Sequence, residues 1–214
     1  MRVAVLISGR GTNLISLIEA TKTPGFPAEI VLVASNRPQA EGLAHATAAG
    51  IPTAAIPSQG RSREDFESDL DQALVRARVD LVCLAGFMRL LTPGFVAGWG
   101  DRLINIHPSL LPAFKGANAH EQAIASGVRI AGCTVHFVRA DMDTGPIIIQ
   151  AAVPVLATDD KATLAARVLA AEHRIYPMAL RWIAEGKVTV DVDDRVTIAD
   201  LASAETGLLI SPAP

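Results

Sequence analysis

Short apolar runs rich in Val, Ile and Leu alternate along the first half of the chain with longer segments whose apolar residues recur at helical spacing. The runs are Val3–Ile7, Ile30–Ala34, Leu81–Leu84 and Leu103–Ile106. Continuous apolar runs of this length are typical of strands buried on both faces, as in a parallel sheet covered by helices. The alternation therefore predicts an α/β fold with a Rossmann-like, mostly parallel sheet flanked by helices.

Three of the intervening segments are predicted to be helices: Asn13–Ala20, Ala40–Ala49 and Ser62–Arg76. The third opens on a serine followed three residues later by Asp65, which is the spacing of a capping box. In this motif the serine side chain accepts a hydrogen bond from a backbone amide of the first turn. Helices between consecutive strands make the N-terminal half doubly wound.

The pattern changes in the C-terminal half. Two β-rich runs, Gly132–Val138 and Ile147–Val155, are joined by a short polar loop, which predicts mixed or antiparallel strands there. A long helix is expected over residues 161–185, and Gly186 would close it, because glycine readily adopts the left-handed backbone that ends helices.

The end of the chain predicts a small hairpin of Val188–Val190 and Val196–Ile198, followed by a frayed terminus that ends in Pro214. No internal repeat or long linker divides the chain. We therefore expect a single domain over residues 1–214. It comprises a phosphate- or nucleotide-binding half (1–100), a half with the candidate catalytic residues (101–190), and a terminal hairpin and tail (191–214).

Charge and composition exclude several classes of partner. Nineteen Lys and Arg face 22 Asp and Glu, a net charge of −3 with no long basic run, so we expect no nucleic-acid partner. The apolar start of the chain is too short for a signal peptide or a membrane span, which favours a cytoplasmic protein with no membrane partner. The two cysteines, Cys83 and Cys133, lie in apolar runs without a Cys-x-x-Cys pair, so we expect no metal.

The glycine-rich segment Ser8–Asn13 lies between a predicted buried strand and a helix, where backbone amides can hold a phosphate. A dinucleotide fingerprint needs a third glycine where Leu14 stands and an acidic residue after the second strand, where Asn36 stands. Arg37 keeps a phosphorylated dinucleotide open, and a plain strand-to-helix turn is the other alternative. A single phosphate monoester fits better. The amides that would hold it are those of Gly11, Thr12 and Asn13.

Two polar residues, Asn105 and His107, end the strand that begins at Leu103, and the period of two along a strand sends both side chains to one face. A tight acidic loop farther along the chain contains Asp143. Taken alone, a strand histidine is also compatible with a hydrogen-bonded core residue, and the acidic loop with a solvated turn.

Together with their neighbours, these residues resemble the folate-dependent formyltransferases, in order and with the expected spacing over about residues 1–186. The Asn-x-His pair with a distant Asp is specific to that superfamily. Within it, the start of the chain and the segment from Glu172 are closest to the members that act on glycinamide ribonucleotide. The matching segments are Ser8–Asn13, Leu84–Leu91, Asn105–Pro112, Gly132–Val138, Asp143–Pro146 and Glu172–Pro177.

The resemblance implies transfer of a formyl group from 10-formyltetrahydrofolate to the amine of glycinamide ribonucleotide in purine biosynthesis. The protein would act on these two small molecules as a monomer or homodimer. The implied catalytic set is Asn105, His107 and Asp143, and Glu172 would contact the glycinamide amine or the ribose. The implied folate contacts are Arg63, Met88, Arg89, Leu90, Leu91, Val96, Leu103, Val138 and Asp141.

Within that set, backbone around Met88–Leu91 and Arg139–Asp143 would hold the pterin ring, and Arg89 and Arg63 would meet the glutamate tail. Substrate contacts from Gly116–His120 stay open, because this segment differs among family members. His136 either orients the site or is a hydrogen-bonded core residue.

Three alternatives remain. A methionyl-tRNA formyltransferase is expected to carry an added C-terminal tRNA-binding domain. A formyltetrahydrofolate hydrolase is expected to carry an N-terminal regulatory domain and a histidine in place of Pro108. A non-catalytic phosphate- or nucleotide-binding module would need only the glycine-rich segment.

Overall fold

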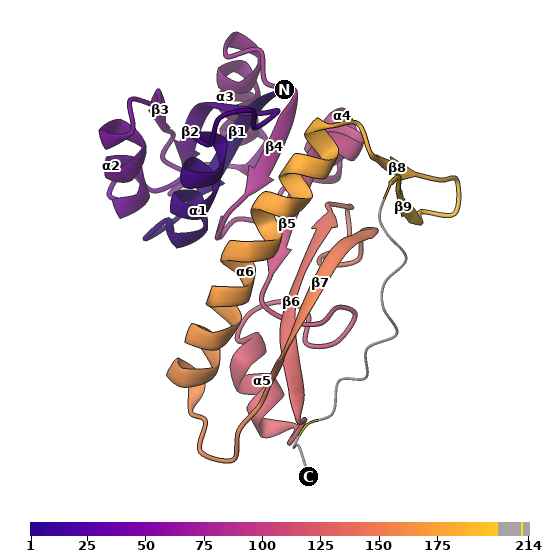
Figure 1. The fold of residues 1–214 in the computed structure, drawn as a ribbon. Helices are drawn as coiled ribbons and strands as arrows, with labels where there is room; N and C mark the ends of the chain where they lie inside the picture. Colours follow the sequence, from indigo (N-terminus) through magenta and orange to yellow (C-terminus); the bar gives the residue numbers. More distant parts are fainter. Residues whose placement is uncertain (201–210, 212–214) are drawn as a thin grey trace.

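The computed structural model describes residues 1–200 and Ser211, and its centre is a seven-stranded sheet of order β3-β2-β1-β4-β5-β6-β7 (Figure 1). The first five strands pair in parallel, whereas β6 and β7 are antiparallel to their neighbours. This confirms the predicted α/β fold and its change of pairing in the C-terminal half. The strands are β1 Arg2–Ile7, β2 Glu29–Ser35, β3 Thr53–Ala55, β4 Leu81–Leu84, β5 Leu103–His107, β6 Ile130–Phe137 and β7 Ile147–Pro154.

Helices cover both faces of the sheet because successive strand residues point to opposite sides. Val3, Val5 and Ile7 pack in one core cluster with residues of α1 and α6, and Ala4 and Leu6 pack in a second cluster with residues of α3 and α4. The helices are α1 Thr12–Thr21, α2 Glu41–Ala48, α3 Arg63–Arg76, α4 Pro93–Trp99, a 3-10 turn Gly100–Arg102, α5 Ala119–Ala125 and α6 Lys161–Ala184.

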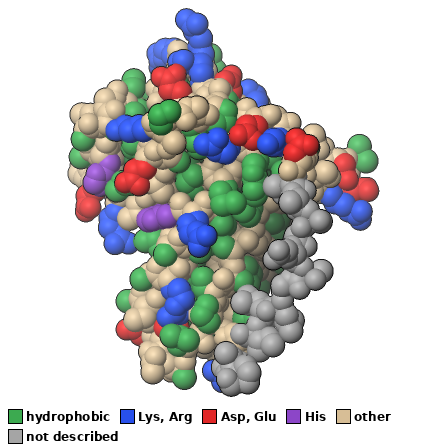
Figure 2. Space-filling view, in the orientation of Figure 1, with side chains coloured by type: hydrophobic (Ala, Val, Ile, Leu, Met, Phe, Trp, Pro, Cys, Tyr) green, Lys and Arg blue, Asp and Glu red, His purple; other side chains and the backbone are tan. Residues whose placement is uncertain are grey.

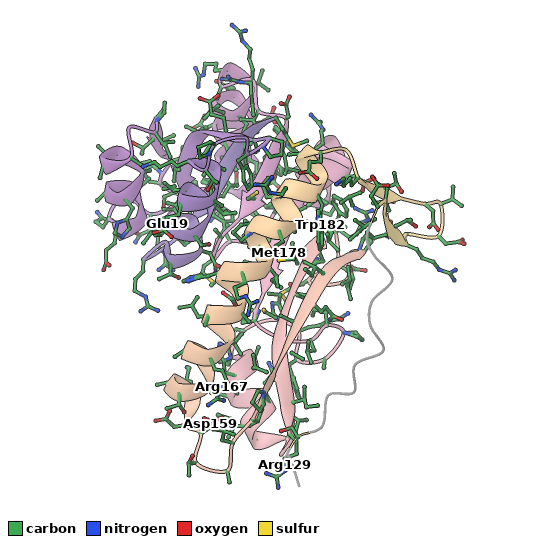
Figure 3. The ribbon with its side chains drawn as sticks, viewed as in Figure 1. Glu19, Arg129, Asp159, Arg167, Met178 and Trp182 are labelled. Atoms are coloured by element: carbon green, nitrogen blue, oxygen red, sulfur yellow. The ribbon has the colours of Figure 1, made fainter. Side chains whose placement is uncertain are left out.

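The long helix α6 crosses one face of the sheet and packs on α1, β6 and β7 (Figure 1). At its start, Arg167 donates to both carboxylate oxygens of Asp159, at 2.6 and 2.9 Å, which joins the helix to the loop before it (Figure 3). This bond lowers the pKa of Asp159. The helix ends at Ala184, and Gly186, with a φ of +71°, closes it as the sequence predicts.

Beyond α6, strands β8 (Val188–Val190) and β9 (Val196–Ile198) pair antiparallel as the predicted hairpin. The predicted cap of α3 is also present, since the Ser62 hydroxyl accepts from the Asp65 amide at 3.0 Å. The division of the chain into halves stays a prediction, and the fraying expected at the terminus concerns residues outside the described ones.

The surface mixes charges of both signs. On the face drawn in Figure 2, Lys and Arg side chains are interspersed with Asp and Glu rather than gathered into one basic area. Among residues 1–200 and 211, no helix has the length and apolar content needed to cross a membrane.

Candidate active site

Asn105 and His107 lie at the C-terminal end of β5, and their side chains point to the same face, as the strand period predicts. The Nδ1 atom of His107 is 3.4 Å from Oδ2 of Asp143, and both side chains are about nine-tenths buried. Because β6 runs antiparallel to β5, His136 lies opposite Asn105 in the sheet. The structure thus brings the three implied catalytic residues to one place.

Asp143 is held in an unusual backbone conformation. Its φ is +54°, a left-handed value that non-glycine residues adopt rarely and that tends to persist at functional sites. The Gly116 amide donates to Oδ2 of Asp143 at 2.8 Å. Two residues along, Gly145 packs so closely on the carbonyl of Phe137 that any side chain would overlap it. These contacts fix the carboxylate beside His107.

Both ring nitrogens of His107 face hydrogen-bond acceptors. Nε2 is 3.0 Å from the carbonyl oxygen of Phe114, and Nδ1 faces Asp143. A neutral imidazole has one N–H and can satisfy only one of these acceptors, whereas the imidazolium has two. Satisfying both acceptors at once would need the imidazolium.

His136 fits the neutral form. Its Nδ1 lies 2.8 Å from the Phe137 carbonyl and must donate there, so Nε2 is left to accept from the Asn105 side-chain amide at 3.2 Å. Burial lowers the pKa of His136, against the opposing effects of the Phe137 hydrogen bond and the Asp143 charge. One amide hydrogen of Asn105 is therefore taken by His136, and the other is free to face the cavity.

A cavity of about 380 Å³, called the central cavity below, opens over these residues. Its wall includes Asn105, His107, His136 and Asp143. Of the predicted folate contacts, those that line it are Met88, Arg89, Leu90, Leu91, Val96 and Val138. Leu103 is fully buried in the core beside the cavity, and Arg63 and Asp141 are exposed residues outside its lining.

Arg89 is engaged with the backbone of the protein. Its guanidinium donates to the carbonyls of Ser58, Arg61 and Ser62 at 3.0–3.2 Å and stacks over the Phe66 ring, 4.9 Å from its centroid. Its Nε is buried without a hydrogen-bond partner among the described residues. Arg89 lines the central cavity, but most of its donors are taken by the protein's own backbone.

The glycine-rich segment leads into α1, and Gly11 caps the helix with φ +75°. β1 lies between β2 and β4 in the sheet, where the strand order reverses, and ligands of open α/β sheets bind beyond such points. The Ser8 hydroxyl donates to Asn36 Oδ1 at 2.5 Å and accepts from the Met88 amide at 2.7 Å. This hydroxyl therefore connects the glycine-rich segment to the loop that lines the central cavity.

Glu172, on α6, is buried against the same segment. Its Oε2 accepts from the Asn13 side-chain amide at 2.6 Å. Burial raises the pKa of Glu172, opposed by this hydrogen bond and by the charge of His107. Oδ1 of Asn13 is buried without a partner among the described residues, so the segment carries one unsatisfied acceptor. The structure brings Glu172 and Asn13 together, although 159 positions separate them.

Ser109, Cys83 and Cys133 are not placed to act as nucleophiles. The Ser109 hydroxyl donates to the Ala113 carbonyl at 2.6 Å, so its hydrogen is engaged with the backbone. Burial raises the pKa of Cys83 and of Cys133 to about 12, so both thiols stay protonated. Within the part of the chain that the structure describes, no group of three or more His, Cys, Asp or Glu residues is arranged to hold a metal ion.

Several contacts were missed by sequence reasoning because they are made by backbone atoms. The Gly116 amide and the Phe114 carbonyl hold the catalytic pair, but neither atom has a sequence signal. A signal that could have indicated the contact to Asp143 is Gly116, because glycine allows a close approach of the backbone.

The chain is similar to known proteins over most of its length. The profile of the family described as formyl transferase matches residues 1–180. A trifunctional purine biosynthetic protein, adenosine-3, from Gallus gallus is 54% identical over 191 residues, which cover 89% of this chain and 19% of that protein. The chain thus spans about a fifth of that relative's length.

Two proteins of similar length also match. A phosphoribosylglycinamide formyltransferase from Escherichia coli is 44% identical over 189 residues, 88% of this chain and 89% of that protein. The crystal structure of glycinamide ribonucleotide transformylase 1 from Symbiobacterium toebii superposes with a TM-score of 0.90 at 47% identity, covering 94% of both chains.

Proposed function

The chain belongs to the formyl transferase family, and we propose that it transfers a formyl group from 10-formyltetrahydrofolate to the amine of glycinamide ribonucleotide in purine biosynthesis. The observation that carries the proposal is the cluster of Asn105, His107 and Asp143 at the wall of the central cavity. The glycine-rich segment Ser8–Asn13 is hydrogen-bonded to the loop that lines the same cavity. We further propose that it acts in the cytoplasm on these two small molecules, as a monomer or homodimer.

The two substrates would take opposite sides of the cluster. The folate would occupy the central cavity, between the Met88–Leu91 loop and Val138. The ribonucleotide phosphate would bind the amides of Gly11, Thr12 and Asn13 at the start of α1, where the helix dipole favours an anion. Glu172 and the free acceptor of Asn13 would then face the ribose or the glycinamide amine.

The proposed reaction needs no covalent enzyme intermediate. The amine nitrogen attacks the formyl carbon, and the carbonyl oxygen becomes an alkoxide in a tetrahedral adduct. The free amide hydrogen of Asn105 donates to this oxyanion. The His107 imidazolium, whose two N–H groups face Phe114 and Asp143, stabilises the oxyanion through its positive charge.

Collapse of the adduct breaks the bond between the formyl carbon and N10 of the folate. The attacking nitrogen loses one proton, and N10 gains one. Asp143, held beside His107, accepts the first proton through water and returns one to N10. Its charge also favours the imidazolium of His107.

A direct assay tests the proposal and separates the alternatives. The protein is incubated with 10-formyltetrahydrofolate, with and without glycinamide ribonucleotide, and folate absorbance is followed. Change that depends on the ribonucleotide is expected. Equal change without the acceptor would indicate a hydrolase, and no change with either mixture would leave only a binding module.

A further inference from the structure

One side chain, Arg139, joins the β8–β9 hairpin to the wall of the central cavity. Its guanidinium donates two hydrogen bonds to the Asp194 carboxylate, from Nε to Oδ2 at 3.0 Å and from Nη2 to Oδ1 at 2.6 Å. The same Nη2 donates to Asp101, in the 3-10 turn after α4, at 2.8 Å. Arg139 thus connects three segments that are far apart in the sequence, and Figure 1 shows the hairpin projecting beside α4.

Hydrogen bonds within the hairpin turn fix the position of Asp194. The Asp191 carboxylate accepts from the amides of Asp193 and Arg195, both at 2.9 Å, which closes the turn with a side chain of the kind that favours turns. Asp194 itself takes a left-handed φ of +61°. Its bidentate contact with the planar guanidinium is the strong form of such a pair, and it lowers the pKa of Asp194.

Arg139 is also connected to Asp143. It opens the loop that ends at Gly145, and a Cβ added at Gly145 would lie 3.2 Å from Cγ of Arg139, so the aliphatic part of this side chain packs on that glycine. The three residues between Arg139 and Asp143, which are Ala140, Asp141 and Met142, are exposed. Asp101 and Asp194 therefore hold Arg139 at the start of the loop through ion pairs near the surface. The Gly116 amide holds Asp143, nearer the end of the loop, through a hydrogen bond at the cavity wall.

We propose that Arg139 is a positioning residue for the folate subsite, and that the β8–β9 hairpin acts through it to hold the loop that carries Asp143. This inference rests on the proposed function. A contribution to folding stability alone is the competing explanation, because exposed ion pairs commonly contribute little and only to stability. The side chain of Asp194 is half exposed and that of Arg139 is one-quarter exposed, so this pair belongs to the exposed class. Distinguishing the two explanations therefore requires a measurement other than stability.

The experiment uses Asp194→Asn, which keeps the shape of the side chain and removes its charge, with Asp193→Asn as the matched control. Asp193 is the adjacent exposed residue of the same turn. Arg139→Lys is the second variant, since lysine keeps the positive charge but cannot make the bidentate contact of the planar guanidinium. For each we would measure the KM of both substrates, kcat, the melting temperature and hydrogen exchange of the amides at 140–145.

Asp194→Asn is expected to raise the KM for 10-formyltetrahydrofolate by roughly twofold to fivefold and to speed exchange at 140–145, with the ribonucleotide KM unchanged. Arg139→Lys is expected to give an intermediate effect, and Asp193→Asn to behave like the parent. Parent-like exchange and folate KM in Asp194→Asn would overturn the proposal, as would equal changes in both KM values that follow a fall in melting temperature. If the parent has no transferase activity, the proposed function fails, and the exchange comparison still decides whether the hairpin holds the loop.

Discussion

Asp143 combines a left-handed backbone with a carboxylate that contacts both the Gly116 amide and His107. Asp143→Asn keeps the shape but removes the charge that favours the imidazolium and the group that accepts the amine proton. We expect kcat to fall by about 10² to 10⁴, with modest change in KM. His107→Ala added to this variant should cost much less than in the parent, because groups that act together are not additive.

The measurement is kcat between pH 5 and 9 for the parent, both single variants and the double variant. His45, an exposed histidine on α2, gives a control variant, His45→Ala. Fully additive losses would show that the two residues act separately.

Arg89 has a structural role that the sequence does not show, since its guanidinium holds the backbone of residues 58–62. Arg89→Ala should raise the folate KM roughly tenfold, about 1.4 kcal/mol, with kcat little altered, and should lower the melting temperature as well. Kinetics and thermal unfolding of the same preparation check both effects. A large loss of kcat at unchanged KM would place Arg89 at the reacting atoms instead.

At the scale of elements, the turn into α1 is constrained from two sides. Gly11 has φ +75°, and a Cβ added there would lie 2.8 Å from Cα of Gly42 at the start of α2. Gly11→Val should therefore weaken binding of the ribonucleotide and also destabilise the fold, because the clash is with backbone. Calorimetry with each ligand, at a temperature where the variant is folded, should show folate binding largely retained. Loss of folate binding alone would reverse the assignment of the two subsites.

The longer elements were predictable because each carries its own pattern. The four buried strands of the N-terminal half, the long helix and the terminal hairpin are confirmed where the apolar runs indicated. β3, α4 and α5 were not predicted. β3 has three residues at the sheet edge, and α4 and α5 have seven each, so their formation depends on packing against the rest of the molecule.

The candidate site was predictable to the same extent. The period of two placed Asn105 and His107 on one face, but no local pattern in the sequence links Asn13 to Glu172 or indicates that Arg89 binds backbone. The geometry of Asp143 depends on a loop path that only the tertiary structure fixes.

At the scale of the whole molecule, the buried Glu172 affects the dependence of stability on pH. Burial raises its pKa in the folded state, so the folded protein binds this proton more tightly than the unfolded chain does. The associated stability is present below the ordinary pKa of glutamate and is lost as pH rises through the raised value. Glu172→Gln removes this term and keeps an acceptor for Asn13. Its melting temperature relative to the parent should therefore rise between pH 4 and pH 8.

Thermal unfolding of both proteins across that range is the measurement, and Glu19→Gln, on the exposed side of α1, is the control. A constant difference between Glu172→Gln and the parent would show that Glu172 titrates normally in the folded protein.

The Ser8 hydroxyl has a consequence for the entropy of the reaction. It bonds both to Asn36 and to the amide of Met88, so the walls of the two proposed subsites share one rigid frame at the end of the sheet. Two bound reactants would then meet at a separation set by the spacing of the strands. Their effective concentration would depend on the stiffness of this frame, and an increase in its disorder would slow transfer even when both substrates bind normally.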